Sequence, residues 1–381
     1  MSPFCSESAW LYLAVTAALG GMLLWRSQSP GQWKRQAGCL AGLWGGACLL
    51  GLSLLCSLLL LSLCCLLLLY VSSSDQELLP VDQKAVLVTG ADSGFGHALA
   101  KQLDKLGFTV FAGVLDGEGP GAEELKKTCS ERLSVLQMDI TKAEQIRDAH
   151  TKVTEKTQDK GLWALVNNAG VLHFPIDGEL LPMTSYRKCM AVNFFGAVEV
   201  TKVFLPLLRK SKGRLVNVSS MGGKVPMEMI AAYCPTKAAV TMFSSVLRLE
   251  LSKWGVKVAT VQPGGFQTNI TGSRDSWDKM ETEILDSFSK ELQEDYGQDY
   301  VRKQKNLLQM MRDNSCPDIT PVLRDIQHAI SARNPSSFYA PGRMASLWIY
   351  FEAYSPTSVL DYVLKKCFGP KHMPRALRTA S

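Results

Sequence analysis

One short stretch, Lys84 to Leu99, limits the possible folds more than any other part of the chain. It begins with an apolar run, Ala85 to Val88, whose β-forming side chains are typical of a buried parallel strand. Glycines follow at Gly90, Gly94 and Gly96, and a helical pattern comes directly after them. A strand, a glycine-rich turn and a helix N-terminus together form an anion site, because backbone N–H groups and the positive end of the helix dipole point to one place. We therefore expect a pyrophosphate-binding turn here.

The chain from Val81 onward alternates strand and helix patterns in the βαβ manner. Strands are expected at Ala85–Val88, Phe108–Val114, Ser134–Met138, Leu162–Val166, Arg214–Val218, Val256–Val261 and Phe338–Ala340. Helices are expected at His97–Leu106, Gly121–Cys129, Lys142–Thr157, Thr184–Leu208 and Thr236–Lys253. This order predicts an α/β fold with a doubly wound parallel sheet of the Rossmann type, whose ligand crevice lies at the carboxyl ends of the strands.

A charged segment, residues 270–330, interrupts this rhythm before the last strand. Its helical patterns, Trp277–Tyr296 and Tyr300–Met311, would stand over the crevice as a lid or substrate wall. A pair of surface helices without a role is the alternative. The tail that follows, residues 346–381, is rich in aromatic and basic residues. Its aromatic stretch, Ser346 to Phe368, either packs on the substrate site or touches a membrane. Its basic residues form a solvated end, with weak contact to anionic lipid as the alternative.

The N-terminal part of the chain is strongly apolar. Trp10 to Trp25 forms one hydrophobic run, and Ala37 to Val71 forms a second run of 35 residues without a charge. At about 1.5 Å per residue the second run is long enough to cross a hydrocarbon core of about 30 Å. A removed signal peptide is an alternative for the first run but does not account for the second. We predict a membrane-anchoring region at residues 1–75, a linker at 76–81 and a catalytic domain at 82–345.

The orientation of this anchor stays open. The basic residues of the N-terminal part lie between the two runs, at Arg26, Lys34 and Arg35. The tendency of basic loops to remain cytosolic favours a lumenal catalytic domain, whether the chain crosses once or twice. A hairpin of re-entrant segments would reverse the side.

Charge and cysteine content exclude several other classes of protein. The net charge of +6 is spread over interleaved basic and acidic residues, without the concentrated basic face and matching motif that nucleic-acid binding requires. The eleven cysteines contain no pair in metal-ligand spacing outside the apolar region, so no metal site is expected.

A second constellation lies far downstream of the glycines. Tyr233 and Lys237 are four residues apart and therefore share one helix face, and Pro235 is tolerated only in the first turn, which places the tyrosine at the helix entrance. A neighbouring ammonium is expected to lower the pKa of the phenol. Ser220, at the end of a strand, is able to donate a hydrogen bond to a substrate oxygen. The set suits proton transfer that accompanies hydride transfer.

Together these motifs resemble the short-chain dehydrogenase/reductase family over about residues 81 to 340. The family's T-G-x-x-x-G-x-G, N-N-A-G, Y-x-x-x-K and P-G-x-x-x-T patterns are all present in order. Pro235 and Thr236 replace the small residue and serine that usually precede the lysine. The resemblance implies a catalytic set of Tyr233, Lys237, Ser220 and Asn193, with Ser220 and Tyr233 also binding substrate.

The resemblance also implies a nicotinamide cofactor. The expected cofactor-binding positions are Thr89, Gly90, Ser93, Gly94, Phe95, Gly96, Asp116, Asp139, Asn167, Ala169, Gly170, Tyr233, Lys237, Pro263, Gly264 and Thr268. NAD is expected rather than NADP, because carboxylates at Asp116 and Asp92 suit a ribose 2′-hydroxyl and repel a 2′-phosphate. The alternative for Asp116 is that it only opens the turn after the second strand.

Within the family, the apolar N-terminus and the stretch around Asn193 resemble the membrane-bound 17β-hydroxysteroid dehydrogenases. That resemblance implies an enzyme of the endoplasmic reticulum membrane that oxidises 17β-hydroxysteroids such as estradiol and testosterone with NAD. A dehydrogenase of retinol or another lipid alcohol is the alternative. A non-catalytic protein of the same fold would have lost one of the catalytic residues, and none is missing. A homodimer through the two long helices is compatible with their apolar faces.

Overall fold

The computed structural model describes residues 15–19, 40–42, 54–74, 78–272, 274–342, 344–368 and 373–378. The chain divides into two units, Met1–Leu79 with Ala332–Asn334, and Pro80–Ser331 with Pro335–Ser381. In the first unit, α3 (Leu54–Ser74) is a helix of 21 residues without a charged side chain. Most of the expected first apolar run, Trp10 to Trp25, lies outside the described residues.

The second unit is built on a sheet of seven strands, all parallel, in the order β3-β2-β1-β4-β5-β6-β7. Its strands are β1 (Ala85–Thr89), β2 (Thr109–Val114), β3 (Leu133–Gln137), β4 (Ala164–Asn167), β5 (Arg214–Val218), β6 (Lys257–Val261) and β7 (Phe338–Tyr339). The predicted Rossmann-type sheet is confirmed, with strand ends displaced by one or two residues. Its central strands are buried along their whole length, which explains why they read as continuous apolar runs.

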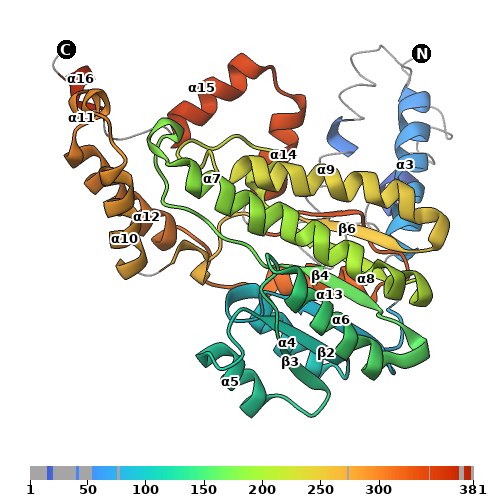
Figure 1. Ribbon diagram of the computed structural model, residues 1–381. Helices are drawn as coiled ribbons and strands as arrows, with labels where there is room; N and C mark the ends of the chain where they lie inside the picture. The colour runs from blue at the N-terminus through green and yellow to red at the C-terminus, as the bar shows by residue number, and fades with distance from the viewer. Residues whose placement is uncertain are drawn as a thin grey trace, which may run out of the picture. The chain divides into compact units, whose positions relative to one another are not determined.

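Helices cover both faces of this sheet (Figure 1). On one face the core contains side chains of α4 (Gly94–Lys105), α5 (Pro120–Thr128) and α13 (Thr320–Ser331). On the other face it contains side chains of α6 (Ala143–Thr157), α8 (Ala197–Ser211) and α9 (Cys234–Leu251). The remaining helices are α7 (Met183–Met190), α10 (Arg274–Asp286), α11 (Lys290–Asp295), α12 (Gln298–Asp313), α14 (Ala345–Tyr354), α15 (Thr357–Phe368) and α16 (Arg375–Arg378).

Two expected segments differ from the structure. The helix predicted at Thr184–Leu208 is interrupted by a π-helical turn, Ala191–Gly196, a distortion that sequence periodicity does not reveal. The end of the segment predicted as a lid, residues 270–330, is α13, which packs in the sheet core through Val322, Leu323 and Ile326. The helices available for a lid are therefore α10, α11 and α12.

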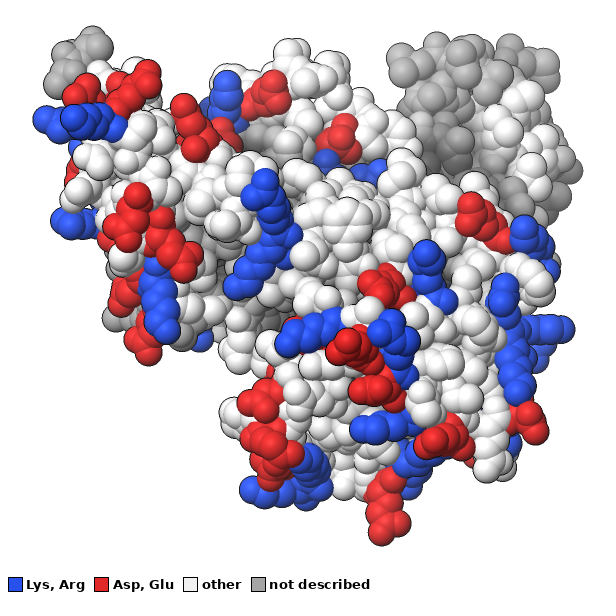
Figure 2. Space-filling model, in the orientation of Figure 1, with Lys and Arg blue, Asp and Glu red and all other residues white. Residues whose placement is uncertain are grey.

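Among the residues whose side chains the structure describes, one helix is long and apolar enough to cross a membrane, judged by length and composition alone; the stretch of α3 among them, Cys56–Leu66, is shorter. The long helix runs Met183–Ser211, through α7, the π-helical turn and α8. In its most apolar window 44% is buried, and α8 contributes Val200, Phe204 and Leu208 to the sheet core. This helix therefore behaves as a core helix of the second unit. Figure 2 shows one face of the molecule, over which positive and negative side chains are interspersed.

Candidate active site

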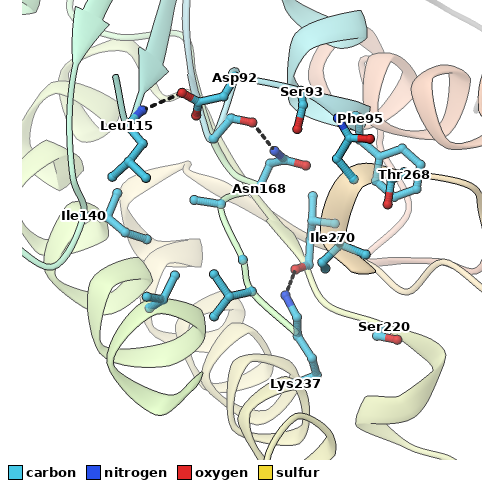
Figure 3. A pocket seen from close by; sticks show the side chains of 18 of the residues that line it. Asp92, Ser93, Phe95, Leu115, Ile140, Asn168, Ser220, Lys237, Thr268 and Ile270 are labelled. Atoms are coloured by element: carbon cyan, nitrogen blue, oxygen red, sulfur yellow. Dashed lines mark hydrogen bonds between the residues drawn. The ribbon is translucent and has the colours of Figure 1, made fainter. Parts of the chain in front are cut away.

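A cavity of about 690 Å³ opens at the carboxyl ends of the strands. Figure 3 shows Leu115 and Ile140 toward one end of it and Ser220 and Lys237 toward the other. The volume falls in the range of about 300–1,000 Å³ that is usual for ligand sites. The parallel sheet accounts for this location, since all its strands end at the same edge and the loops after β1, β4 and β5 meet there.

The glycine-rich turn after β1 forms one wall of the cavity. Gly90 and Gly94 have φ of +66° and +59°, a left-handed backbone that other residues rarely adopt. A Cβ atom at Gly96 would overlap the Gly90 carbonyl oxygen and lie 2.5 Å from Nδ2 of Asn168. That amide donates to the carbonyl oxygens of Thr89 (2.9 Å) and Gly90 (3.1 Å). The glycines therefore let the turn, the helix and the loop after β4 approach one another closely.

The three residues expected to be catalytic, other than Asn193, lie at the opposite end. Tyr233 is the N-cap residue of α9 and a proline stands in the first turn, so the predicted position of the tyrosine at the helix entrance is confirmed. Lys237 lies one turn further on, with Nζ 5.7 Å from the centre of the tyrosine ring and donating to the Val218 carbonyl oxygen at 3.1 Å. Ser220 lies two residues after the end of β5; its hydroxyl accepts the backbone N–H of Gly222 at 3.1 Å and also acts on the phenol of Tyr233.

Burial dominates the acid–base behaviour of this trio. It raises the pKa of Tyr233 above the ordinary value of 10, against the opposing effect of the hydrogen bond with Ser220. It also lowers the pKa of Lys237 to about 8. The expectation that the lysine lowers the tyrosine pKa is therefore not met by the protein groups alone. Because water is excluded from both side chains, each shifts toward its neutral form.

Besides Gly96 and Asp116, three expected site residues do not line the cavity, and these three hold its walls. Asn193, inside the π-helical turn, accepts from the backbone N–H of Val171 (2.8 Å) and donates to the Val171 carbonyl (3.0 Å) and to Thr236 Oγ1 (3.0 Å). Thr89 Oγ1 accepts from the backbone N–H of residues 168 and 169. Asn167 donates to Thr201 and Asn217 in the core between β4 and β5. These groups fix the loop after β4.

The structure separates the two carboxylates expected to select the cofactor. Asp116 is not among the lining residues, and its Oδ1 accepts from the backbone N–H of Glu118 at 3.0 Å, which agrees with the simpler turn-opening interpretation. Asp92 does line the cavity, and its Oδ1 accepts from the backbone N–H groups of Leu115 (2.8 Å) and Asp116 (3.4 Å). The carboxylate at the end of β2 is therefore that of Asp92.

Most of the other expected positions meet at the cavity. Those that line it are Gly90, Ser93, Gly94, Phe95, Asp139, Ala169, Gly170, Ser220, Tyr233, Lys237, Pro263, Gly264 and Thr268. The lining residues that were not among the expected site residues include Leu115, Ile140, Asn168, Lys188, Phe266 and Ile270. Motif spacing carries no signal for most of these, because apolar residues reach a cavity through the fold. Asn168 is the exception, since it lies inside the N-N-A-G motif.

The geometry matches a known family. The family model described as short chain dehydrogenase matches residues 84–279. Estradiol 17-beta-dehydrogenase 2 of Rattus norvegicus is 77% identical over 381 residues, which is 100% of each chain. The chain belongs to the short-chain dehydrogenase family. It is therefore an oxidoreductase, and the resemblance predicted from its motifs is confirmed.

Two further comparisons agree with this assignment. The 17-beta-hydroxysteroid dehydrogenase type 2 of Homo sapiens is 62% identical over 380 residues, 99% of this chain and 98% of the human chain. A short-chain dehydrogenase from Streptomyces avermitilis superposes with a TM-score of 0.58 at 27% identity, covering 74% of this chain and 94% of that chain. The cavity, its glycine-rich wall and its lysine fit the pyrophosphate and ribose groups of the dinucleotide that such dehydrogenases require.

Proposed function

We propose that this short-chain dehydrogenase oxidises the 17β-hydroxyl group of steroids, estradiol to estrone and testosterone to androstenedione, with NAD. The substrate class is proposed because the chain is 77% and 62% identical, over nearly its full length, to two relatives named as 17β-hydroxysteroid dehydrogenases. The meeting of Tyr233, Lys237 and Ser220 in one cavity carries the chemistry.

Four residues of the chain have separate roles in the proposed reaction. NAD, when bound, supplies the acceptor for the hydride that leaves the carbinol carbon. Tyr233 accepts the hydroxyl proton as a phenolate, having first released its own proton to the relaying water, and the positive charges of Lys237 and of a bound nicotinamide ring would favour that form. Ser220 donates a hydrogen bond to the same oxygen and so orients it. Lys237, the next turn of α9, holds positive charge near the phenol and binds the nicotinamide ribose. Asn193 fixes the loop beside them and supports a proton-relaying water.

The preference for NAD rests on Asp92. Its carboxylate lines the cavity at the end of β2, where the adenosine ribose of a bound dinucleotide would lie. A 2′-phosphate there would meet a negative charge, whereas a 2′-hydroxyl would meet a hydrogen-bond acceptor.

The variant Asp92→Asn is therefore expected to bind NADP at least roughly tenfold more tightly than the wild type, with a smaller change for NAD. Asparagine keeps an oxygen that accepts from Leu115 and removes only the charge. Dissociation constants for both cofactors, measured by fluorescence titration, test this, and Asp116→Asn is the matched control. Equal effects of the two substitutions on NADP binding would contradict the assignment to Asp92.

The substrate assignment is tested with membranes that express the full chain. Estradiol, testosterone and retinol are offered in parallel with NAD, and the formation of NADH is followed beside a Tyr233→Phe control. Steroid oxidation that is absent from the control is the expected result. Oxidation of retinol without oxidation of steroids would preserve the mechanism and replace the substrate, and no oxidation of any of them would remove the proposed function.

We also infer that the enzyme resides in the endoplasmic reticulum membrane. The helix α3 has no charged residue and, at about 1.5 Å per residue, is about 30 Å long, which matches a hydrocarbon core. The helices α14 and α15 support a second lipid contact, because they expose apolar and aromatic side chains followed by two exposed lysines. These are Leu347, Tyr350, Tyr354, Val359, Tyr362, Lys365 and Lys366.

A homodimer is the assembly that the exposed apolar residues favour. Met242, Val246 and Leu249 are exposed and share one face of α9, and Phe195 is exposed in the π-helical turn before α8. Side chains of this kind on two long helices are typical of an interface between copies.

A further inference from the structure

The lid helices form a hydrophobic core of their own, apart from the two faces of the sheet. Side chains from α10 and α12 pack against the loop that follows β4 and against Ala232, the residue before the catalytic tyrosine. The members of this core are Phe174, Ile176, Leu180, Leu181, Cys189, Ala232, Trp277, Ile284, Phe288, Tyr300 and Val301. The segment predicted as a lid therefore shares a core with the segment that presents Tyr233.

Two tyrosines of the lid region donate hydrogen bonds to carboxylates of the same loop. Tyr300 Oη lies 2.6 Å from Asp177 Oδ2, and Tyr296 Oη lies 3.0 Å from Glu179 Oε2. Tyr300 is 1% exposed, whereas Glu179 is on the surface. Burial and the neighbouring carboxylate raise the pKa of Tyr296 to about 12 and also raise that of Tyr300, so both phenols keep the proton that they donate.

Asp177 stands between two residues that contact the segment of the catalytic tyrosine. The backbone N–H of Ile176 donates to the Met229 carbonyl oxygen at 2.9 Å. Gly178 lies so near Ala231 that a Cβ atom on it would be 3.0 Å from the Ala231 side chain. The two neighbours of Asp177 therefore contact the backbone of Met229 and the side chain of Ala231.

Met229 shows why this backbone needs support. Its φ is +67°, in the left-handed region that a methionine rarely adopts. Such a conformation persists only where the surroundings hold it, and the bond from Ile176 is one of the contacts that do so. The next residue, Ile230, accepts the backbone N–H of Tyr233 at 3.0 Å.

We propose that Tyr300 and Asp177 are positioning residues for the catalytic tyrosine, with the lid holding Tyr233 in place through the loop after β4. Tyr300 fixes Asp177, Asp177 fixes its two neighbours, and these hold the strained segment that ends in Tyr233. The proposal rests on the proposed function only in taking Tyr233 as the base. Asp177 lies between both contact residues, whereas Glu179, which Tyr296 bonds, adjoins only Gly178 and lies on the surface, so the bond from Tyr296 has the smaller effect.

The comparison of Tyr300→Phe with Tyr296→Phe tests this in the full chain. Each variant removes one phenol–carboxylate hydrogen bond and keeps the ring. Tyr300→Phe is expected to lower kcat for the wild-type substrate roughly 10- to 100-fold with an unchanged Kd for NAD, because displacement of a catalytic group costs rate rather than cofactor binding. Tyr296→Phe is expected to change kcat less than about twofold. Equal losses in the two variants would overturn the proposal.

Substitutions of Asp177 provide a second test. Asp177→Asn keeps an acceptor oxygen and is expected to retain most of kcat, whereas Asp177→Ala is expected to match Tyr300→Phe. The double variant Tyr300→Phe/Asp177→Ala is expected to be no slower than Asp177→Ala, as for two groups that act as one unit. Additive losses would overturn the coupling.

Hydrogen exchange separates this proposal from the proposed function. The backbone amides of residues 229–234 are expected to exchange faster in Tyr300→Phe than in the wild type or in Tyr296→Phe, with similar unfolding temperatures for the two variants. If the wild type oxidises no steroid, the proposed function fails while this readout still decides the positioning role. Unchanged exchange in Tyr300→Phe would refute it.

Discussion

Replacement of Tyr233 by Phe will reduce steroid oxidation roughly a thousandfold and leave NAD binding nearly unchanged. The phenol is the group expected to take the hydroxyl proton, and phenylalanine fills the same buried space without a proton acceptor. Initial rates of NADH formation and a fluorescence titration with NAD measure the two quantities on one preparation.

The matched control is Tyr362→Phe, which removes a phenol from an exposed position on α15. It is expected to leave the rate within about twofold of the wild type. Retention of a tenth or more of the wild-type rate by Tyr233→Phe would show that another group takes the proton. A large fall in its unfolding temperature would indicate lost structure rather than lost chemistry.

Replacement of Lys237 by Met will abolish most activity and at the same time make the protein more stable at pH 7. Burial lowers the pKa of Lys237 to about 8 from the ordinary value of 10.5. Keeping this buried ammonium charged therefore costs about 3 kcal/mol at neutral pH, since each pKa unit corresponds to about 1.36 kcal/mol. Methionine removes this cost but also loses the hydrogen bond to the Val218 carbonyl oxygen. The free energy of unfolding is therefore expected to rise by roughly 1–3 kcal/mol.

The lowered pKa of Lys237 determines how the stability of the wild type changes with pH. The unfolded chain binds the lysine proton up to about pH 10.5 and the folded chain only up to about pH 8. The penalty in the wild type is therefore complete below pH 8 and is relieved as the pH rises from 8 to 10.5. The difference in unfolding free energy between Lys237→Met and the wild type should shrink over that interval. A difference that is constant from pH 7 to pH 10 would show that the lysine does not titrate in this way.

The motifs of this chain predicted the fold and most of the cofactor wall. Gly90 and Gly94 have to adopt a left-handed backbone, and Gly96 has to admit a carbonyl oxygen at close range. Few residue types other than glycine meet these requirements, so the glycines of the motif by themselves predict the turn. The continuous apolar strands likewise predicted a parallel sheet covered on both faces. Local requirements of this kind are visible without knowledge of distant contacts.

Other features depended on which distant residues meet. The sequence favoured Asp116 as the cofactor-binding carboxylate, with Asp92 beside it in the glycine turn. Only the path of the chain after β2 brings Asp92 into the cavity and leaves Asp116 in its own turn. Asn193, inside the π-helical turn, bonds to Val171 and Thr236, neither of which is near it in sequence. The sequence did not show that α13 packs in the sheet core, because the charged residues around it resemble those of the segment predicted as a lid.

The sequence by itself therefore determined the fold and the family and predicted the catalytic residues, because spacing along one strand or helix fixes which side chains share a face. The tertiary structure alone decided how those residues behave. The pKa values of Tyr233 and Lys237 follow from the exclusion of water by the packed domain, and the link from Tyr300 through Asp177 to Met229 joins three segments that are far apart in the chain. Burial and long-range contact are properties of the assembled molecule, and no local pattern of residues encodes them.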